Sequence, residues 1–361
     1  MTAPVGRSTL VSFLFAAALA GAAPVKLIFD TDMGNDVDDV MALCMIHSLQ
    51  QRGAVDLLGV TITKDHPQAA AFVDAVNTFY GRPDVPIGVV KGGATRDAGK
   101  FNLLAEARND DGSLRYPHDL PGGDEAPEAV GLLRRLLAAE ADHGVTLVQV
   151  GFFTNFRRLL ESPPDANSPL AGRDLVARKV RLLAVMAGQF GAADPGKRDA
   201  EFNVATDIPA ARALAQGWPS PVVWSGCEIG SAVPFPHEVI EQDFAYVEHH
   251  PLKEAYCLYE PPPHDRPTWD ATALLYAVYP ERGYFTLSAP GLVTVDDKGI
   301  TTHAPSPDGK GRDRHLVMDA GQAARVREAI VQLCVEPPPG PARRGGRASA
   351  GPEPPAPEPH P

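Results

Sequence analysis

Five aspartates crowd into ten residues near the start of the chain, at positions 30, 32, 36, 38 and 39. No Lys or Arg lies among them, so nothing nearby in sequence neutralises their mutual repulsion. Such crowding requires that some carboxyl groups stay protonated or that a hard cation binds, and oxygen-only ligands favour Ca²⁺ or Mg²⁺. Asp36 or Asp38 alone has a simpler explanation, as a helix cap at the positive end of the following helix. The whole segment predicts a metal site.

Two other interpretations of this segment start from Asp30. An EF-hand loop counted from Asp30 needs Gly at its sixth position and Glu at its twelfth, where the chain has Asn35 and Met41. That interpretation fails. A phosphatase of the haloacid dehalogenase type also begins with a strand and D-x-D, which would make Asp30 a nucleophile and Asp32 its acid-base partner. That family has Thr or Val where this chain has Gly34, so the phosphatase is the weaker alternative.

The run KLIFDTDMGNDVDDVMAL at residues 26–43 resembles the aspartate signature of the inosine-uridine preferring nucleoside hydrolases, in a longer DTDxGxDxDD form. Three later segments resemble that family in the same order along the chain: QVGFFTNF at 149–156, EFN at 201–203 and TWD at 268–270. The resemblance spans most of the chain. It implies an α/β fold and hydrolysis of the N-glycosidic bond of ribonucleosides to ribose and free base.

The resemblance also implies a Ca²⁺ ion and its ligands. Asp32, both carboxylate oxygens of Asp39, the backbone carbonyl of Thr154 and a carboxylate oxygen of Asp270 would hold it. Such a cation lowers the pKa of a bound water, and Asp32 beside it can accept the proton. The transition state resembles an oxocarbenium ion, whose developing positive charge the surrounding carboxylates stabilise.

The same resemblance assigns contacts to the sugar. Asp38, Asp270 and Asn203 would bind the 2′ and 3′ hydroxyls of ribose, and Glu201 would bind the 5′ hydroxyl. For Glu201 and Asn203 the alternative is a pair of polar residues that only satisfies a loop, because loops carry polar residues by default.

Three positions depart from the family pattern. Trp269 stands where many members have a His that protonates the leaving base, although a purine-specific branch also has Trp there. We therefore expect Trp269 to stack on a purine, with a buried core aromatic as the alternative. The usual G-N after the second strand is replaced by residues 64–66, KDH, which leaves Asp65 as the substitute ribose contact. Residues 191–200 lack an Asn that often binds the 5′ hydroxyl, so substrates altered at that position become conceivable.

These residues must be positioned by alternating strands and helices. Continuous apolar runs predict buried strands, and apolar residues at helical spacing predict helices between them. The strands are expected at 25–29, 55–63, 85–90, 145–151, 180–186 and 222–224, and the helices at 40–49, 67–81 and 127–143. This alternation predicts an α/β fold with a mostly parallel central sheet and helices on both faces, in which ligands bind beyond the carboxyl ends of the strands.

The two ends of the 361-residue chain are expected to lie outside this fold. Residues 1–23 show the charged, apolar and small-residue order of a secretory signal peptide, which predicts an exported protein that is off the membrane after cleavage. Residues 24–335 form the predicted domain, and the Pro-rich tail 336–361 is expected to be disordered. Cys227 and Cys257 could pair in an oxidising compartment.

Composition limits the partners. The chain has 33 Lys plus Arg against 45 Asp plus Glu, a formal charge of -12, which would repel the phosphates of nucleic acid. A small nucleoside is the expected partner, alongside a dimer or tetramer of the chain itself. Besides the phosphatase, one rival function is left open by the missing His, namely a Ca²⁺-dependent protein that binds ribosyl ligands without cleaving them.

Overall fold

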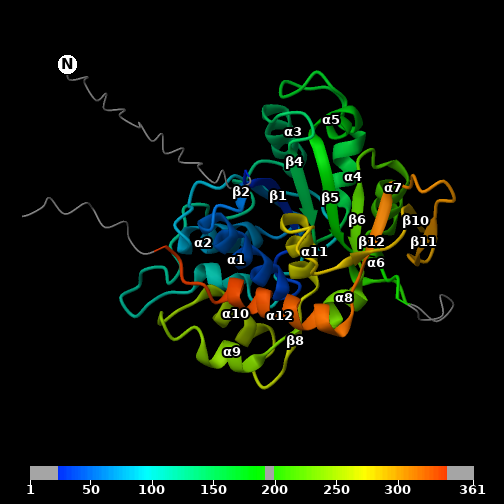
Figure 1. Ribbon diagram of the computed structural model, residues 1–361. Coiled ribbons are helices and arrows are strands. Elements are labelled where there is room, and N and C mark those ends of the chain that lie inside the picture. The colour runs from blue at the N-terminus through cyan, green and yellow to red at the C-terminus, as the bar shows by residue number, and fades with distance from the viewer. Residues whose placement is uncertain (1–22, 192–198, 340–361) are drawn as a thin grey trace, which may run out of the picture.

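Strand β1, which carries the first aspartates, lies between β4 and β2 inside a mixed and mostly parallel sheet (Figure 1). The computed structural model describes residues 23–191 and 199–339. The strands are β1 (Val25–Thr31), β2 (Val55–Ile62), β3 (Ile87–Val89), β4 (Val145–Gln149), β5 (Val180–Met186), β6 (Val222–Ser225), β7 (Pro234–Phe235), β8 (Arg266–Pro267), β9 (Thr286–Leu287), β10 (Gly291–Val295), β11 (Thr301–Pro305) and β12 (Asp313–Val317).

Within the described residues, the main sheet has the order β11-β10-β12-β6-β5-β4-β1-β2-β3. From β12 to β3 all neighbours run parallel, whereas β10 is antiparallel to β11 and β12, and β9 adds an antiparallel pair with β12. Strands β7 and β8 form a separate antiparallel pair. Because β1, β4, β5 and β6 are parallel neighbours, their carboxyl ends lie along one edge of the sheet.

Helices cover both faces of the sheet, as predicted (Figure 1). One face is covered by α1, α2, α11 and α12, and the other by α3, α4, α5 and α7, each with its own apolar core. The helices are α1 (Asp38–Gln51), α2 (Pro67–Phe79), α3 (Ala129–Ala139), α4 (Thr154–Glu161), α5 (Gly172–Lys179), α6 (Phe202–Thr206), α7 (Ile208–Gly217), α8 (Cys227–Ser231), α9 (His237–Gln242), α10 (Pro251–Tyr259), α11 (Trp269–Val278), α12 (Ala320–Cys334) and the 3₁₀ helix η1 (Asn102–Glu106).

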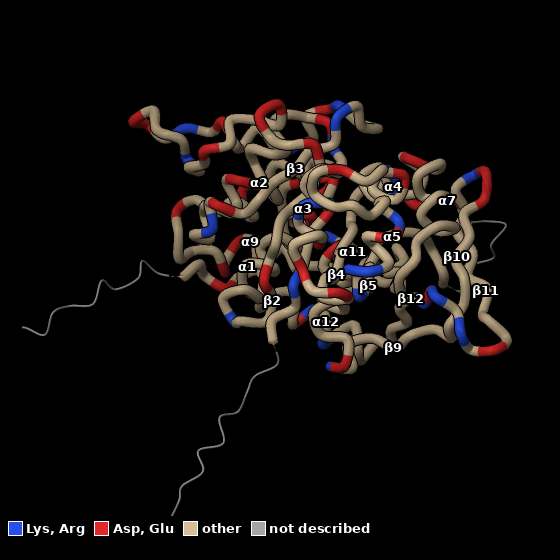
Figure 2. The backbone as a smooth tube through the Cα atoms, turned by 90° about the horizontal axis from the view of Figure 1, so that it is seen from above, with Lys and Arg blue, Asp and Glu red and all other residues tan. Residues whose placement is uncertain are grey.

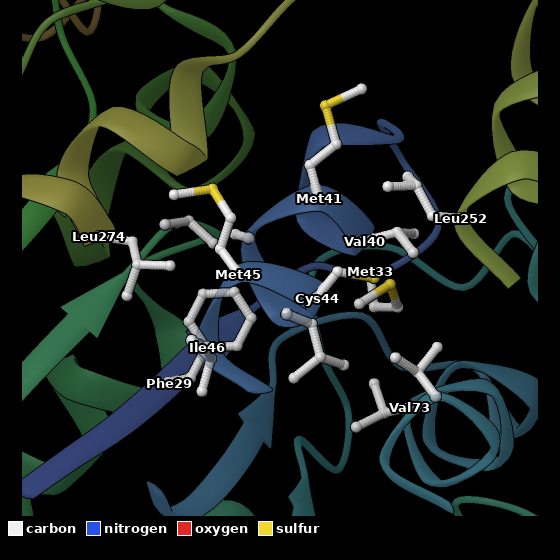
Figure 3. Close-up of a cluster of buried hydrophobic side chains, with 14 of the residues drawn as sticks. Phe29, Met33, Val40, Met41, Cys44, Met45, Ile46, Val73, Leu252 and Leu274 are labelled. Atoms are coloured by element: carbon white, nitrogen blue, oxygen red, sulfur yellow. The ribbon is translucent and has the colours of Figure 1, made fainter. Parts of the chain in front are cut away.

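Helix α1 is buried along nearly all its length, which explains why its sequence is apolar on every side. Figure 3 shows its side chains, Met45 among them, packed between Phe29 of β1, Val73 of α2, Leu252 of α10 and Leu274 of α11. Packing on four sides fixes the helix rigidly against the sheet. Its first turn, which carries two of the aspartates, is therefore held at the carboxyl edge of β1.

The fold confirms the predicted α/β class and extends it. Each of the six predicted strands and three predicted helices is present with small changes at its ends, whereas the short strands of the antiparallel edge were not predicted. Cys227 and Cys257 are thiols in the structure and not a disulfide. The predicted signal segment 1–23 and tail 336–361 fall outside the described residues except at their inner ends.

Charge and hydropathy add two observations. Figure 2 shows Lys and Arg interspersed with the more numerous Asp and Glu along the backbone. Among the helices of the described residues, none combines the length and the apolarity that crossing a bilayer requires.

Gly34 lies in the turn between β1 and α1 and has a φ of 116°, a conformation that L side chains rarely adopt. A Cβ there would lie 2.1 Å from Nδ2 of Asn102. Asn102 cannot easily yield, because it is fully buried and this amide donates to the carbonyl of Met33. The glycine of the aspartate motif is thus required by the turn.

We expect Gly34→Ala to lower the free energy of unfolding by more than ~2 kcal/mol, from backbone strain and overpacking together. Gly53→Ala is the matched control, because Gly53 also has a positive φ but its Cβ would meet nothing within 4 Å. Urea denaturation measures both. Equal losses for the two variants would show that the contact with Asn102 contributes nothing.

Candidate active site

The carboxyl edge of the sheet opens into a cavity of about 450 Å³. Its walls come from the ends of three parallel strands, through Asp32, Val150 and Met186, and from the segments that follow β6 and β8. Such a position beyond the strand ends is where open α/β sheets bind ligands. The remaining lining residues are Asn35, Asp36, Asp38, Asp39, Glu201, Phe202, Asn203, Cys227, Tyr259, Arg266, Trp269 and Asp270.

Asp30, the first aspartate of the motif, points away from this cavity. It is fully buried, and its Oδ2 accepts hydrogen bonds from Thr61 at 2.6 Å and Asn155 at 2.9 Å. Burial raises its pKa to about 7. Asp30 therefore ties β1 to β2 and α4, and it is not placed to attack a ligand in the cavity as a phosphatase nucleophile would.

Three carboxylates form a cluster where two helices begin. Asp38 and Asp39 are in the first turn of α1 and Asp270 is in the first turn of α11, all three buried, with ligand oxygens within 4.8 Å of one another. The backbone N–H of Asp270 donates to Oδ2 of Asp38 at 3.0 Å, which joins the two helix starts. The positive ends of both helix dipoles favour negative charge at this point.

The cluster fits a hard cation. Burial and the neighbouring carboxylates raise the pKa of Asp38, Asp39 and Asp270 well above the ordinary value, which shows how costly their charges are without a counter-ion. Oδ1 of Asp39 accepts a hydrogen bond from the hydroxyl of Thr31, while its buried Oδ2 has no hydrogen-bond partner. A buried carboxylate oxygen that accepts no hydrogen bond, beside two more carboxylates, provides the oxygen ligands that a hard metal ion prefers.

Asp32 lies next to this cluster. Its Oδ2 accepts a hydrogen bond from Nδ2 of Asn35 at 2.5 Å. Burial raises its pKa to about 6, and the hydrogen bond from Asn35 and the positive charge of Lys64 oppose that rise. A carboxylate poised in this range is suited to accept a proton from a nearby water.

The opposite wall is polar and comes from the EFN segment. Glu201 caps α6, accepting from the backbone N–H groups of Asn203 at 2.9 Å and Gly188 at 3.1 Å, and burial raises its pKa to about 7. Nδ2 of Asn203 donates to the carbonyls of Val150 at 2.8 Å and Met186 at 3.1 Å. Because these carbonyls occupy the amide nitrogen, the oxygen of Asn203 is the atom left to accept from a ligand.

The third wall is aromatic and cationic. Trp269 begins α11 and is half-buried, and its Nε1 donates to the carbonyl of Cys227 at 2.9 Å and to Ser231 at 3.0 Å, which fixes the indole. The guanidinium carbon of Arg266 lies 5.0 Å from the centre of this ring, while Nε of Arg266 donates to Asp36 at 3.0 Å. This wall therefore presents a flat apolar surface beside a neutralised cation.

The Asp65 carboxylate and the Thr154 side chain lie outside this cavity. Oδ2 of Asp65 accepts a hydrogen bond from the backbone N–H of Gly93 at 3.1 Å and forms a salt bridge with Nε of Arg96 at 3.2 Å. Thr154 lies in a separate surface depression, where its hydroxyl donates to Asp207. Of the QVGFFTNF segment, it is Val150 at the end of β4 that lines the cavity.

Sequence reasoning also missed three neighbours of the aspartates. Arg266 pairs with Asp36, and Lys64 contacts Asn35, so two cations do approach the motif that has none nearby in sequence. Asn35 stands inside the motif, but the sequence alone does not indicate its contact with Asp32. The position of Lys64 directly after the predicted buried strand 55–63 is a signal, whereas nothing in the local sequence marks Arg266.

A comparison with protein families assigns the class. The family model described as inosine-uridine preferring nucleoside hydrolase matches residues 27–329. The chain therefore belongs to the inosine-uridine preferring nucleoside hydrolase family, and the resemblance predicted from the four motifs is confirmed.

The individual relatives and solved structures share less than a third of their residues with this chain. The chain is similar to the pyrimidine-specific ribonucleoside hydrolase RihA of Klebsiella pneumoniae, 28% identical over 208 residues that cover 57% of this chain and 61% of the relative. Its fold resembles a purine-preferring ribonucleoside hydrolase from Gardnerella vaginalis, with a TM-score of 0.64, 17% identity and coverage of 86% and 99%. It also resembles the inosine-uridine preferring nucleoside hydrolase from Bacillus anthracis, with a TM-score of 0.62 and 18% identity, over 86% of this chain and 99% of that one.

The buried carboxyls predict how stability depends on pH. In the metal-free protein, Asp32 and Glu201 hold protons up to a pKa of about 6 and about 7, above their values in an unfolded chain. The folded state then binds more protons than the unfolded state, so the free energy of unfolding falls as pH rises from about 4 to 7.

We expect the melting temperature in a chelator to be lower at pH 8 than at pH 5, and calorimetry measures it. Glu201→Gln cannot titrate at this position, so its melting temperature should vary less with pH than that of the wild type. A metal-free protein that becomes more stable as pH rises over this range would contradict the assignment.

Proposed function

We propose that the chain is a Ca²⁺-dependent nucleoside N-ribohydrolase that releases ribose and a free base, with a preference for purine nucleosides. One observation carries the proposal, namely a single cavity with a buried all-oxygen cluster, a polar wall and an aromatic wall. These walls match the three parts of the reaction, which need an activated water, a bound sugar and a held base.

The cation would be held by Asp32, Asp39, Asp270 and a backbone carbonyl. The family resemblance assigns that carbonyl to Thr154, whose side chain lies in a neighbouring depression, and Val150, which lines the cavity, offers a second carbonyl that also accepts from Nδ2 of Asn203 at 2.8 Å. When bound, Ca²⁺ lowers the pKa of water and so supplies a nucleophile at neutral pH.

The chain's own groups complete the chemistry. Asp32, with one oxygen held by Asn35, accepts the proton of the attacking water. Asp38, Asp270 and the oxygen of Asn203 would bind the 2′ and 3′ hydroxyls of ribose, and Glu201 would bind the 5′ hydroxyl, because all four residues line the cavity. The negative charge of the carboxylates that line the cavity stabilises the positive charge that develops on the sugar ring in the transition state.

Purine preference is inferred from Trp269. Its indole is fixed by two hydrogen bonds and lines the cavity together with Phe202, which is 59% exposed. The lining residues described here include no His that could protonate a leaving base. A purine carries a ring nitrogen that takes a proton from solvent, and it offers more stacking area than a pyrimidine. The Klebsiella relative is named pyrimidine-specific, which is the opposite preference.

A reducing-sugar assay on inosine, with and without Ca²⁺, tests the proposal. We expect ribose release by the wild type, its loss in a chelator and its return when Ca²⁺ is added. Asp32→Asn should lower kcat by at least about a thousandfold, because the variant loses both a metal-binding charge and the proton acceptor.

Asp65→Asn is the matched control, since this carboxylate lies outside the cavity and its loss should change kcat by less than about threefold. Binding of nucleosides without ribose release would identify a ribosyl-binding protein instead. Phosphate release from phosphate esters, with Asp30 indispensable, would support the phosphatase.

Trp269 gives the second test. Trp269→Ala should remove roughly 1 to 3 kcal/mol of transition-state stabilisation for inosine, in line with the stacking of bases on aromatic side chains. Trp269→Phe keeps a flat ring and should retain most of that activity, whereas Trp269→His adds an acid and should favour uridine.

The measurement is kcat/KM for inosine and uridine in all four proteins. Equal values for the two nucleosides in the wild type would remove the purine preference. A Trp269→Ala protein that melts at a lower temperature but keeps its kcat/KM would assign Trp269 to the core.

A further inference from the structure

Lys64 follows β2 and is a lysine with no exposed surface, which is costly unless its ammonium group is paired. The ammonium donates to Oδ1 of Asn35 at 2.5 Å and to Oδ1 of Asp97 at 2.8 Å. Asp97 is 65% exposed, and an ion pair with so exposed a partner contributes little. Asn35, which lines the cavity, is the partner through which Lys64 reaches the site.

The chemistry of the two side chains fixes their arrangement. A lysine ammonium group can only donate hydrogen bonds, so it must face the oxygen of the Asn35 amide. The nitrogen of the same amide then faces the other way, and it donates to Oδ2 of Asp32 at 2.5 Å. If the amide turned over, its oxygen would face the carboxylate of Asp32 and its nitrogen the ammonium of Lys64, and both contacts would be repulsive.

We propose that Lys64 is a positioning residue that locks the Asn35 amide in the one orientation that holds Asp32. This inference rests on the proposed function, in which Asp32 binds the cation and accepts the proton. With Oδ2 of Asp32 held by Asn35, the plane of its carboxylate is fixed and its other oxygen is free to serve the cation and the water. Lys64 does not line the cavity, and its hydrogen bond toward the site is the one to Asn35.

The effect on Ca²⁺ affinity separates positioning from simple charge. Lys64 is a positive group near a cation site, so charge alone predicts that its removal strengthens Ca²⁺ binding. Positioning predicts the opposite, because an unlocked Asn35 leaves Asp32 disordered and weakens the site. The two accounts therefore differ in the sign of the change.

The experiment measures Ca²⁺ binding by calorimetry, and kcat for inosine, in the wild type, Lys64→Met, Lys64→Arg, Asn35→Ala and the Lys64→Met, Asn35→Ala double variant. We expect Lys64→Met to raise the Kd for Ca²⁺ at least about threefold and to lower kcat about tenfold or more. Lys64→Arg keeps a donor and should recover a large part of both losses. In the Asn35→Ala background, Lys64→Met should change either value by less than about twofold, because Lys64 acts through Asn35.

Tighter Ca²⁺ binding in Lys64→Met would overturn the proposal, and so would effects of Lys64→Met and Asn35→Ala that add independently. Melting temperatures are recorded for all the proteins. If Lys64→Met does not fold, the effect of Lys64→Arg on Kd and kcat is compared instead in the wild type and in the Asn35→Ala background. If the wild type binds Ca²⁺ but releases no ribose, the proposed hydrolysis fails while the Ca²⁺ titrations still decide the role of Lys64. A wild type that binds no Ca²⁺ would overturn both.

Discussion

The interaction on which this structure depends is the repulsion among carboxylates that folding removes from water. The parallel sheet holds β1 between β4 and β2, and the starts of α1 and α11 meet beyond its carboxyl end through the hydrogen bond from Asp270 to Asp38. Burial raises the pKa of the four carboxyl groups that meet at this point, those of Asp32, Asp38, Asp39 and Asp270. A chain that only needed to fold would gain by replacing them, so their presence indicates a cation and a reaction that uses negative charge.

The aspartates of the motif are not equivalent, because the fold gives each a different partner. Asp36 is neutralised by Arg266, which brings the segment before α11 across the cavity and sets the position of its aromatic wall. Asp32 is held by Asn35, whose other end is held by Lys64. The carboxylates at the helix starts have no cationic side chain among these contacts, and they are the ones left for a metal ion.

The sequence predicted the elements whose signals are local, namely the buried strands, the first helices and the motifs that follow the strand ends. It misplaced Asp65, where one position decides the direction of a side chain. Successive residues of an extended segment point to opposite sides, so Lys64 reaches the motif while Asp65 points away. Val150 directly follows β4 and lines the cavity, whereas the side chain of Thr154, four residues later at the start of the next helix, lies in a neighbouring depression. Arg266 could not be found, because its pairing partner lies 230 residues away.

The central claim is that a hard cation balances these carboxylates, and diffraction from crystals grown with Ca²⁺ tests it most directly. We expect one anomalous difference peak per chain in the cavity, about 2.3 to 2.6 Å from oxygens of Asp39 and Asp270, with Asp32 and a backbone carbonyl completing the site. A cavity with no such peak at saturating Ca²⁺, with the carboxylates unchanged in position, would contradict the account.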